Sequence, residues 1–144
     1  MQKIDRASWP RAELFRFFST VSHPFYSVTF RVDVTNLHAY TRAHGISFYY
    51  ALGYLVTDAA NAVENFRYTI RNGDVYLLDE RTPSLTDLKP GSGQFHIVTL
   101  PKVGTLEDFC RAAKARSAAQ QTFLDQDGET DVLLYISCTP WFDL

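Results

Sequence analysis

One stretch of apolar residues constrains the fold of this chain more than any other feature. Between Ser47 and Val63, apolar side chains recur at the spacing of an α-helix and occupy most of its circumference. A helix that is apolar on most sides is buried, because a surface helix keeps a polar face toward water. We therefore expect a helix over residues 47–63 that packs against a sheet. Its apolar residues are Phe48, Leu52, Leu55, Val56, Ala59 and Val63.

The rest of the chain supplies that sheet. Residues 28–34 alternate apolar and polar side chains, which is typical of a strand with one buried face. Asn72-Gly73 separates two β-type runs and predicts a hairpin, because both residues tolerate positive φ. Thr105 predicts the start of a second long helix, because its oxygen can accept a backbone N–H near Asp108. The full expectation is helices at 10–19, 47–63 and 105–124, strands at 28–34, 66–70, 75–79, 83–88, 94–100 and from 132 onward, a loop at 89–93 and a polar turn at 125–131. This order indicates one α/β domain, a two-layer sandwich with a mixed sheet.

Length, charge and composition exclude several classes of protein. The 144 residues fit one domain, and 46% apolar residues provide enough material for a core. A net charge of −2 and a pI of about 6.0 give no basic footprint for nucleic acid. No apolar run reaches the roughly 20 residues of a membrane span, and the first residues lack an apolar signal, so we expect a cytoplasmic protein. Cys110 and Cys138 have no metal-ligand spacing, and we expect two reduced, buried thiols.

The four histidines show no catalytic or metal-binding pattern. No second histidine or cysteine stands at ligand spacing from any of them, so we expect no metal site. The chain also has no G-x-S-x-G nucleophile elbow and no P-loop. His38 and His44 lie among polar residues, and we expect them to be structural or exposed. His23 precedes Pro24 and His96 lies in an expected strand, so each is either structural or part of a pocket wall.

Two further features have both a structural and a functional interpretation. The aromatic cluster of Phe17, Phe18, Phe25 and Tyr26 can pack the first helix on a strand, or it can form the apolar wall of a ligand pocket. Ser137 follows an apolar run of strand type. Its hydroxyl can bond to nearby backbone, or it can donate to an oxyanion that develops during acyl transfer.

Several short motifs occur in an order that is more specific than any one of them. They are Trp9-x-Arg11 with Phe15, Phe17 and Phe18; Ser27-x-Thr29 and Val32-Asp33-Val34-Thr35; Ser47-Phe48-Tyr49; Asn61 with Phe66-Arg67; Asn72-Gly73-Asp74-Val75 with Asp79; and Ile136-Ser137-x-x-Pro140-Trp141. In this order they resemble the chloramphenicol acetyltransferases of the trimeric, CoA-dependent type. The match runs almost without gaps over residues 9–86, loosens over residues 87–131 and then tightens again.

This resemblance implies a fold, a reaction and a set of site residues. It implies the CoA-dependent acyltransferase-like fold and the transfer of acetyl from acetyl-CoA to a hydroxyl of chloramphenicol or a similar small molecule, which is an antibiotic-resistance activity. In the family the general base is a histidine of a C-terminal His-His-x-x-x-Asp-Gly motif, and the active site lies between subunits of a homotrimer. The implied roles are oxyanion stabilisation by Ser137, pairing of Arg11 with the aspartate of that motif, and a substrate wall formed by Phe17, Phe18, Pro24, Tyr26 and Tyr135.

The same resemblance shows what the 144 residues do not contain. There is no His-His pair, and no histidine has an aspartate four residues later. We therefore expect residues 1–144 to be the N-terminal portion of a single domain of this family, incomplete at its C-terminus. Without its base, which is typically worth about 10²–10⁴-fold, we expect the chain to be inactive alone. The alternative is a non-catalytic binding or assembly protein of the same fold. The aromatic pair Phe17-Phe18 replaces a Phe-Tyr pair of the family, and Tyr135 replaces a frequent asparagine. The sequence therefore leaves the identity of the acceptor molecule open.

Overall fold

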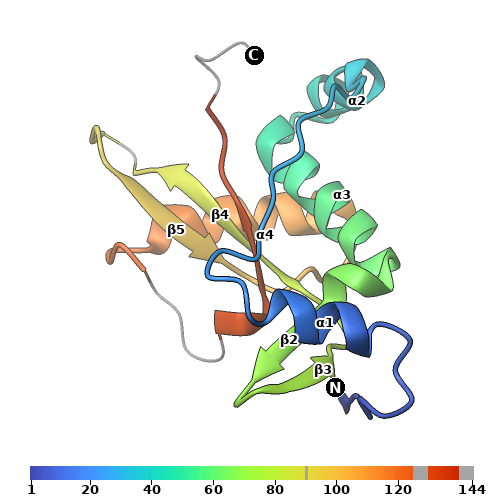
Figure 1. Cartoon of the computed structure of the whole chain (residues 1–144). Helices are drawn as coiled ribbons and strands as arrows, with labels where there is room; N and C mark the ends of the chain where they lie inside the picture. The colour runs from blue at the N-terminus through green and yellow to red at the C-terminus, as the bar shows by residue number, and fades with distance from the viewer. Residues whose placement is uncertain (90, 125–129, 140–144) are drawn as a thin grey trace.

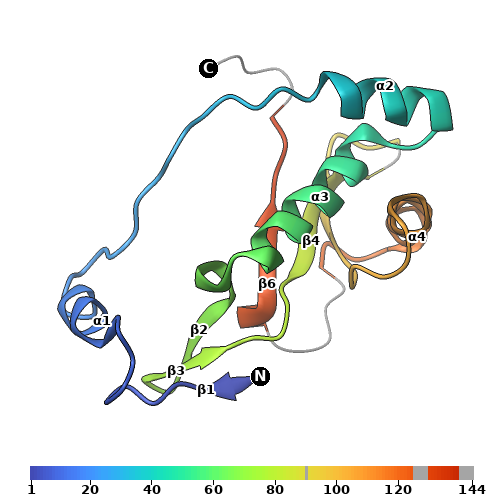
Figure 2. The same cartoon turned by 90° about the vertical axis from the view of Figure 1, so that its right-hand side faces the viewer.

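The computed structural model describes residues 1–89, 91–124 and 130–139. Within these residues the strands form two three-stranded sheets, in the orders β1-β3-β2 and β5-β4-β6 (Figures 1 and 2). The elements in chain order are β1 Gln2–Lys3, α1 Ala12–Phe18, α2 Thr35–His44, α3 Phe48–Ala62, a 3₁₀ helix Glu64–Arg67, β2 Tyr68–Arg71, β3 Asp74–Leu77, β4 Thr82–Leu88, β5 Phe95–Thr99, α4 Leu106–Ala119, a 3₁₀ helix Thr130–Val132 and β6 Leu133–Ile136.

The second sheet and two long helices form the two layers that the sequence predicts. β4 is the central strand, and it pairs antiparallel with β5 and parallel with β6. The sheet is therefore mixed, as expected. Helices α3 and α4 pack against each other and cover one face of this sheet (Figures 1 and 2). No helix within the described residues has the length and apolar character that a membrane span requires.

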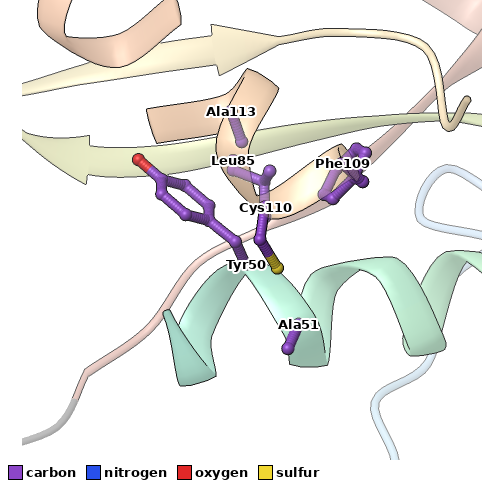
Figure 3. Packing of buried hydrophobic residues seen from close by; sticks show 6 residues of the cluster. All are labelled: Tyr50, Ala51, Leu85, Phe109, Cys110 and Ala113. Atoms are coloured by element: carbon purple, nitrogen blue, oxygen red, sulfur yellow. The ribbon is translucent and has the colours of Figure 1, made fainter. Parts of the chain in front are cut away.

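The core lies between α3, α4 and β4. Leu85 of β4, Ala51 of α3 and Phe109 of α4 are completely buried there (Figure 3). Gly53 permits this close approach of helix and strand, because a Cβ at that position would lie 2.7 Å from Leu85 Cδ2. The prediction that the helix over residues 47–63 packs against a sheet is confirmed along this contact. Its burial on most sides is wrong within the described chain, because four of its six named apolar residues are exposed: Leu55, Val56, Ala59 and Val63.

Local signals in the sequence explain where the main elements begin and turn. Ser47 caps α3, since its side chain accepts the N–H of Tyr50, and Thr105 forms a capping box with Asp108 at the start of α4. The hairpin between β2 and β3 turns at Asn72 and Gly73, which have φ values of 52° and 81°. The predicted cap at Thr105 and the predicted hairpin are confirmed, and the cap at Ser47 is an addition from the structure.

Helix α4 is shorter than the predicted range of residues 105–124. It ends at Ala119, and Gln120 has an extended backbone with φ −69° and ψ 124°. The Gln120 side chain donates to the Ile97 carbonyl at 2.9 Å, and the Ile97 N–H donates to the Phe123 carbonyl at 2.8 Å. Because of these hydrogen bonds, residues 120–124 lie beside β5 and do not continue the helix. The predicted polar turn at 125–131 lies mostly outside the described residues, and its last two residues begin a 3₁₀ helix.

The predicted strand over residues 28–34 is wrong within the described chain. These residues are in no helix or strand, and they connect α1 to α2 at a distance from both sheets (Figure 2). A strand needs a partner for its backbone groups, and no described strand pairs with this segment. Because the segment joins no sheet, its alternating apolar residues are exposed: Val28, Phe30 and Val32.

Helix α2 is an element that the sequence interpretation missed. It follows Asp33, whose carboxylate accepts the N–H of Thr35 at 2.9 Å, and it ends before Gly45. Asp33 and Gly45 were the available signals for its two ends. His38 and His44 lie exposed on this helix, in agreement with the structural or exposed role expected for them.

Candidate functional site

Ser137 lies just beyond the end of β6, on the sheet face opposite α3 and α4. Leu85 and Ile136 are partners in the parallel β4–β6 register, and both face the helices. Because side chains alternate along a strand, Thr86 and Ser137 belong to the other face. There the Thr86 hydroxyl donates to Ser137 Oγ at 3.1 Å. Ser137 is exposed, so its hydroxyl can reach a bound molecule.

Tyr49 fixes the backbone next to this serine. It lies in the first turn of α3, in the Ser47-Phe48-Tyr49 motif, and its hydroxyl donates to the Ile136 carbonyl at 3.1 Å. Burial raises the pKa of Tyr49 above its ordinary value, so the phenol stays protonated as a donor. The peptide that joins Ile136 to Ser137 is thereby tied to α3.

The start of β6 is anchored by a carboxylate. Asp131 accepts from Arg71 Nε at 2.6 Å, from Arg71 Nη2 at 3.0 Å and from the Thr69 hydroxyl at 2.9 Å. Arg81 in turn donates to the Asp131 carbonyl and to the Tyr68 carbonyl. The hydrogen bonds from Arg71 hold the pKa of Asp131 below its ordinary value. The first sheet is therefore bonded to the turn that leads into β6, the strand before Ser137.

Two residues of the sequence motifs support the turn from α3 into the sheets. Asn61 pairs with the backbone of Arg81 in both directions, at 2.7 Å to its N–H and 3.2 Å to its carbonyl. Arg67 donates to the Leu78 carbonyl at 2.9 Å. Both side chains bond backbone that no strand partner satisfies, so their role in this chain is structural.

A buried polar network lies on the helix side of the same sheet. Asp87 of β4 accepts from the Tyr50 hydroxyl and from the Ser117 hydroxyl, the latter at 2.7 Å. His96 Nε2 lies 2.9 Å from Ser117 Oγ, and since the Ser117 proton goes to Asp87, the imidazole is the donor there. Nδ1 of His96 has no partner among the described residues. Burial, together with the hydrogen bond to Asp87, raises the pKa of Tyr50.

This network borders a cavity of about 540 Å³. Tyr50, Asp87 and Ser117 line it, with Arg111 and Lys114 of α4 at the same opening. His96 is buried behind Ser117 and does not itself line the cavity, so of its two expected roles the structural one holds. Sequence reasoning missed the network because its four members come from four separate elements. His23, the other histidine considered for a pocket, is exposed and contacts Ser22 and Phe25.

The expected substrate wall is at the surface of the described chain. The interpretation of the aromatic cluster as packing between a helix and a strand is wrong, because no strand forms at residues 28–34 and the cluster is exposed. Phe17 and Phe18 contact each other edge to face, with ring centroids 5.2 Å apart. The role of these residues as a wall stays a prediction. The exposed residues of the aromatic cluster and of the expected wall, taken together, are Phe17, Phe18, Pro24, Phe25, Tyr26 and Tyr135.

Three other expectations concern single side chains. Arg11 is exposed and forms no ion pair with an acid of the described chain, so its pairing with the aspartate of the family motif stays a prediction. Cys110 is buried in the core as expected, and burial raises the pKa of its thiol. The same expectation is wrong for Cys138, which is exposed because β6 ends two residues before it.

Known proteins with a similar sequence or structure share one description. A family model described as "CAT: Chloramphenicol acetyltransferase" matches residues 1–144. Chloramphenicol acetyltransferases 2 and 3 of Escherichia coli are 25% and 23% identical to the chain over 142 residues, which is 96% of the chain and 67% of each relative. A chloramphenicol acetyltransferase of Clostridium perfringens is 33% identical over 86 residues, which is 59% of the chain and 40% of that protein.

A solved structure extends this similarity to three dimensions. A chain described as chloramphenicol acetyltransferase superposes with a TM-score of 0.82 at 27% identity, and the match covers 97% of the present chain and 70% of that chain. The fold is thus the CoA-dependent acyltransferase-like α/β fold that the sequence motifs imply. The chain spans about two thirds of the length of its Escherichia coli relatives. It belongs to the chloramphenicol acetyltransferase family.

Proposed function

We propose that residues 1–144 are the N-terminal portion of one acetyltransferase domain, which moves acetyl from acetyl-CoA to a hydroxyl of chloramphenicol or a similar small molecule. The observation that carries the proposal is the position of Ser137. In a chain of this family, an exposed serine hydroxyl stands at a strand end that Tyr49 and Thr86 hold in place, and Asp131 anchors the start of the same strand. Such a fixed donor suits a charge that develops in a transition state.

The proposed reaction gives the serine one task. The acceptor hydroxyl attacks the thioester carbonyl, a C–O bond forms, and the carbonyl oxygen becomes an oxyanion that accepts the Ser137 proton in a hydrogen bond. The C–S bond then breaks, CoA leaves as its thiol after taking up the proton that the acceptor lost, and the acetyl ester is released. One donor of this kind is typically worth about 10²–10³-fold in kcat.

The remaining roles follow from the family and complete the proposal. Phe17, Phe18, Pro24, Tyr26 and Tyr135 form the wall that receives an aromatic acceptor, for which exposed aromatic side chains are suited. Arg11 is available to pair with an aspartate outside the described residues. The general base is a histidine that these 144 residues do not provide, so the proposal includes a lack of activity by the chain alone. A homotrimer that brings wall and base together is part of the same proposal.

An acetyl-transfer assay with detection of the released CoA thiol tests this proposal. The 144-residue chain is assayed with chloramphenicol alone, and then with the C-terminal fragment of an Escherichia coli relative that carries the His-His-x-x-x-Asp-Gly motif. We expect thiol release only in the mixture. The fragment alone, and a fragment whose two motif histidines are replaced by alanine, are the controls.

Two outcomes contradict the proposal. Turnover by the 144-residue chain alone contradicts the missing base. A mixture that stays inactive, although the two pieces associate in sedimentation, contradicts the acetyltransferase role and favours the binding or assembly protein of the same fold.

A further inference from the structure

The hydroxyl of Ser137 is itself a hydrogen-bond acceptor, and its donor is Thr86. Thr86 occupies the central strand β4, where its backbone is paired with Ile97 of β5 on one side. On the other side, Leu85 and Ile136 form the last pair of the β4–β6 register, so Thr86 stands beside the first residue after the strand. The donor is therefore held by its pairing with β5, whereas Ser137 lies beyond the last strand pair.

The direction of this hydrogen bond matters for the serine. A hydroxyl has one proton and two acceptor sites. When Ser137 Oγ accepts the Thr86 proton at 3.1 Å, its own proton remains free to donate away from the sheet. Accepting a hydrogen bond also polarises the Ser137 O–H group and makes it a stronger donor. In the reverse direction, the Ser137 proton would be used on Thr86.

The surroundings of Thr86 restrict both hydroxyls. Thr86 is half-buried, and its β-branched side chain has few χ1 rotamers available in a strand. Tyr49 donates to the Ile136 carbonyl at 3.1 Å, in the peptide that leads into Ser137. Hydrogen bonds from α3 and from β4 thus meet at the end of β6.

We propose that Thr86 is a positioning residue for Ser137: its hydroxyl holds Ser137 Oγ and leaves the serine proton directed at the substrate oxyanion. The role rests on the proposed acetyl transfer, in which Ser137 is the donor. Threonine or serine satisfies this role, and valine, which has the same shape without a donor, does not.

The first test needs no enzymatic activity. A chain with Ser137→Cys and Cys138→Ser carries a thiol at position 137, and a hydrogen bond to a thiolate lowers the pKa of the thiol. The pH at which iodoacetamide alkylation of this thiol is half-maximal is read by peptide mass spectrometry, with circular dichroism as the control for folding. We expect the further change Thr86→Val to raise this pH by about one unit, and Thr86→Ser to leave it within a few tenths. An equal midpoint for threonine and valine in folded chains overturns the proposal.

The second test separates the positioning role from the hydrogen bond itself. In the mixture with the C-terminal fragment, we expect Thr86→Val to lower kcat about tenfold, the size of one ordinary hydrogen bond, with little change in the KM for acetyl-CoA. Thr86→Ser restores kcat. A shifted alkylation midpoint with an unchanged kcat overturns the positioning role. An inactive mixture contradicts the proposed function, and the midpoint still decides whether Thr86 donates to position 137.

Discussion

Two regions of the described chain contain the same kinds of apolar residue, but these residues are buried in one region and exposed in the other. In the layer of α3, α4 and the β5-β4-β6 sheet, Phe109 is 0% exposed, whereas Phe25, in the segment that joins α1 to α2, is 78% exposed. Val98 of β5 is 0% exposed, and Val28 in a similar alternating pattern is 66% exposed. Apolar alternation therefore gives a buried strand only where a partner strand and a covering helix are present.

This difference separates two roles within one chain. The sheet and its helices hold Ser137 through Tyr49, Thr86 and the anchor of β6 at Asp131. The expected wall residues, from Phe17 to Tyr26, stand outside that core. We expect substitutions in the sheet and its helices to change the free energy of unfolding and the position of Ser137. We expect substitutions among the wall residues to change the binding of an acceptor molecule.

The largest expected effect contrasts two phenylalanines. Phe109→Ala removes a fully buried side chain from between α3 and β4, and we expect a loss of about 3–5 kcal/mol in the free energy of unfolding. Phe25→Ala is the matched control, and we expect a change within about 0.5 kcal/mol, because its ring is exposed. Urea unfolding followed by circular dichroism measures both. Equal losses would contradict the contrast between the two regions.

A smaller effect is expected at the anchor of β6. Asp131→Asn weakens the bonds from Arg71, and because these side chains are 29% and 22% exposed, we expect a loss of about 1–2 kcal/mol at pH 7. The pKa of Asp131 is lowered in the folded state, so this stabilisation is present above its unfolded pKa of about 4 and is lost as the pH falls through the folded value.

The pH dependence of unfolding distinguishes this anchor from ordinary surface charges. We expect the difference between the original chain and Asp131→Asn to narrow as the pH is lowered below about 4. Asp79→Asn is the control, since the Asp79 side chain is 86% exposed and pairs only with the N-terminal ammonium among the described groups. A difference that stays constant over this range would argue against the ion pair.

The smallest effect concerns the hairpin turn. Gly73 has φ 81°, and a Cβ added there would have no heavy atom within 4 Å. Gly73→Ala therefore brings backbone strain without a clash, and we expect a cost of about 1 kcal/mol. Gly93→Ala has equally open space and no positive φ, and we expect almost no cost. Thermal unfolding of the two variants compares them directly. An equal loss of stability at both positions would contradict a turn in which Gly73 has a positive φ.

Local chemistry decided which parts of the fold the sequence could predict. The capping box of Thr105 and the turn at Asn72-Gly73 depend on neighbouring residues alone, and both are confirmed. The strand expected at 28–34 depends on a distant partner, which no local pattern reveals. Helix α2 was missed because most of its residues are polar, although Asp33 and Gly45 mark its ends.

The candidate site divides in the same way. Ser137 was found through an ordered set of motifs, because a motif records a residue type at a spacing. The hydrogen bond from Thr86 joins residues 51 positions apart and depends on the parallel register of β4 and β6, which sequence spacing does not give. Likewise, the contact of His96 with Ser117 joins a strand to a helix, 21 residues apart.

The measurement that tests the central claim most directly is the effect of Ser137→Ala on acetyl transfer in the mixture with the C-terminal fragment. Alanine keeps the strand end and removes the hydroxyl that Thr86 and the sheet hold. The account predicts a fall in kcat of about 10²–10³-fold with little change in the KM for the acceptor. An unchanged kcat would contradict the assignment of Ser137 as the oxyanion donor.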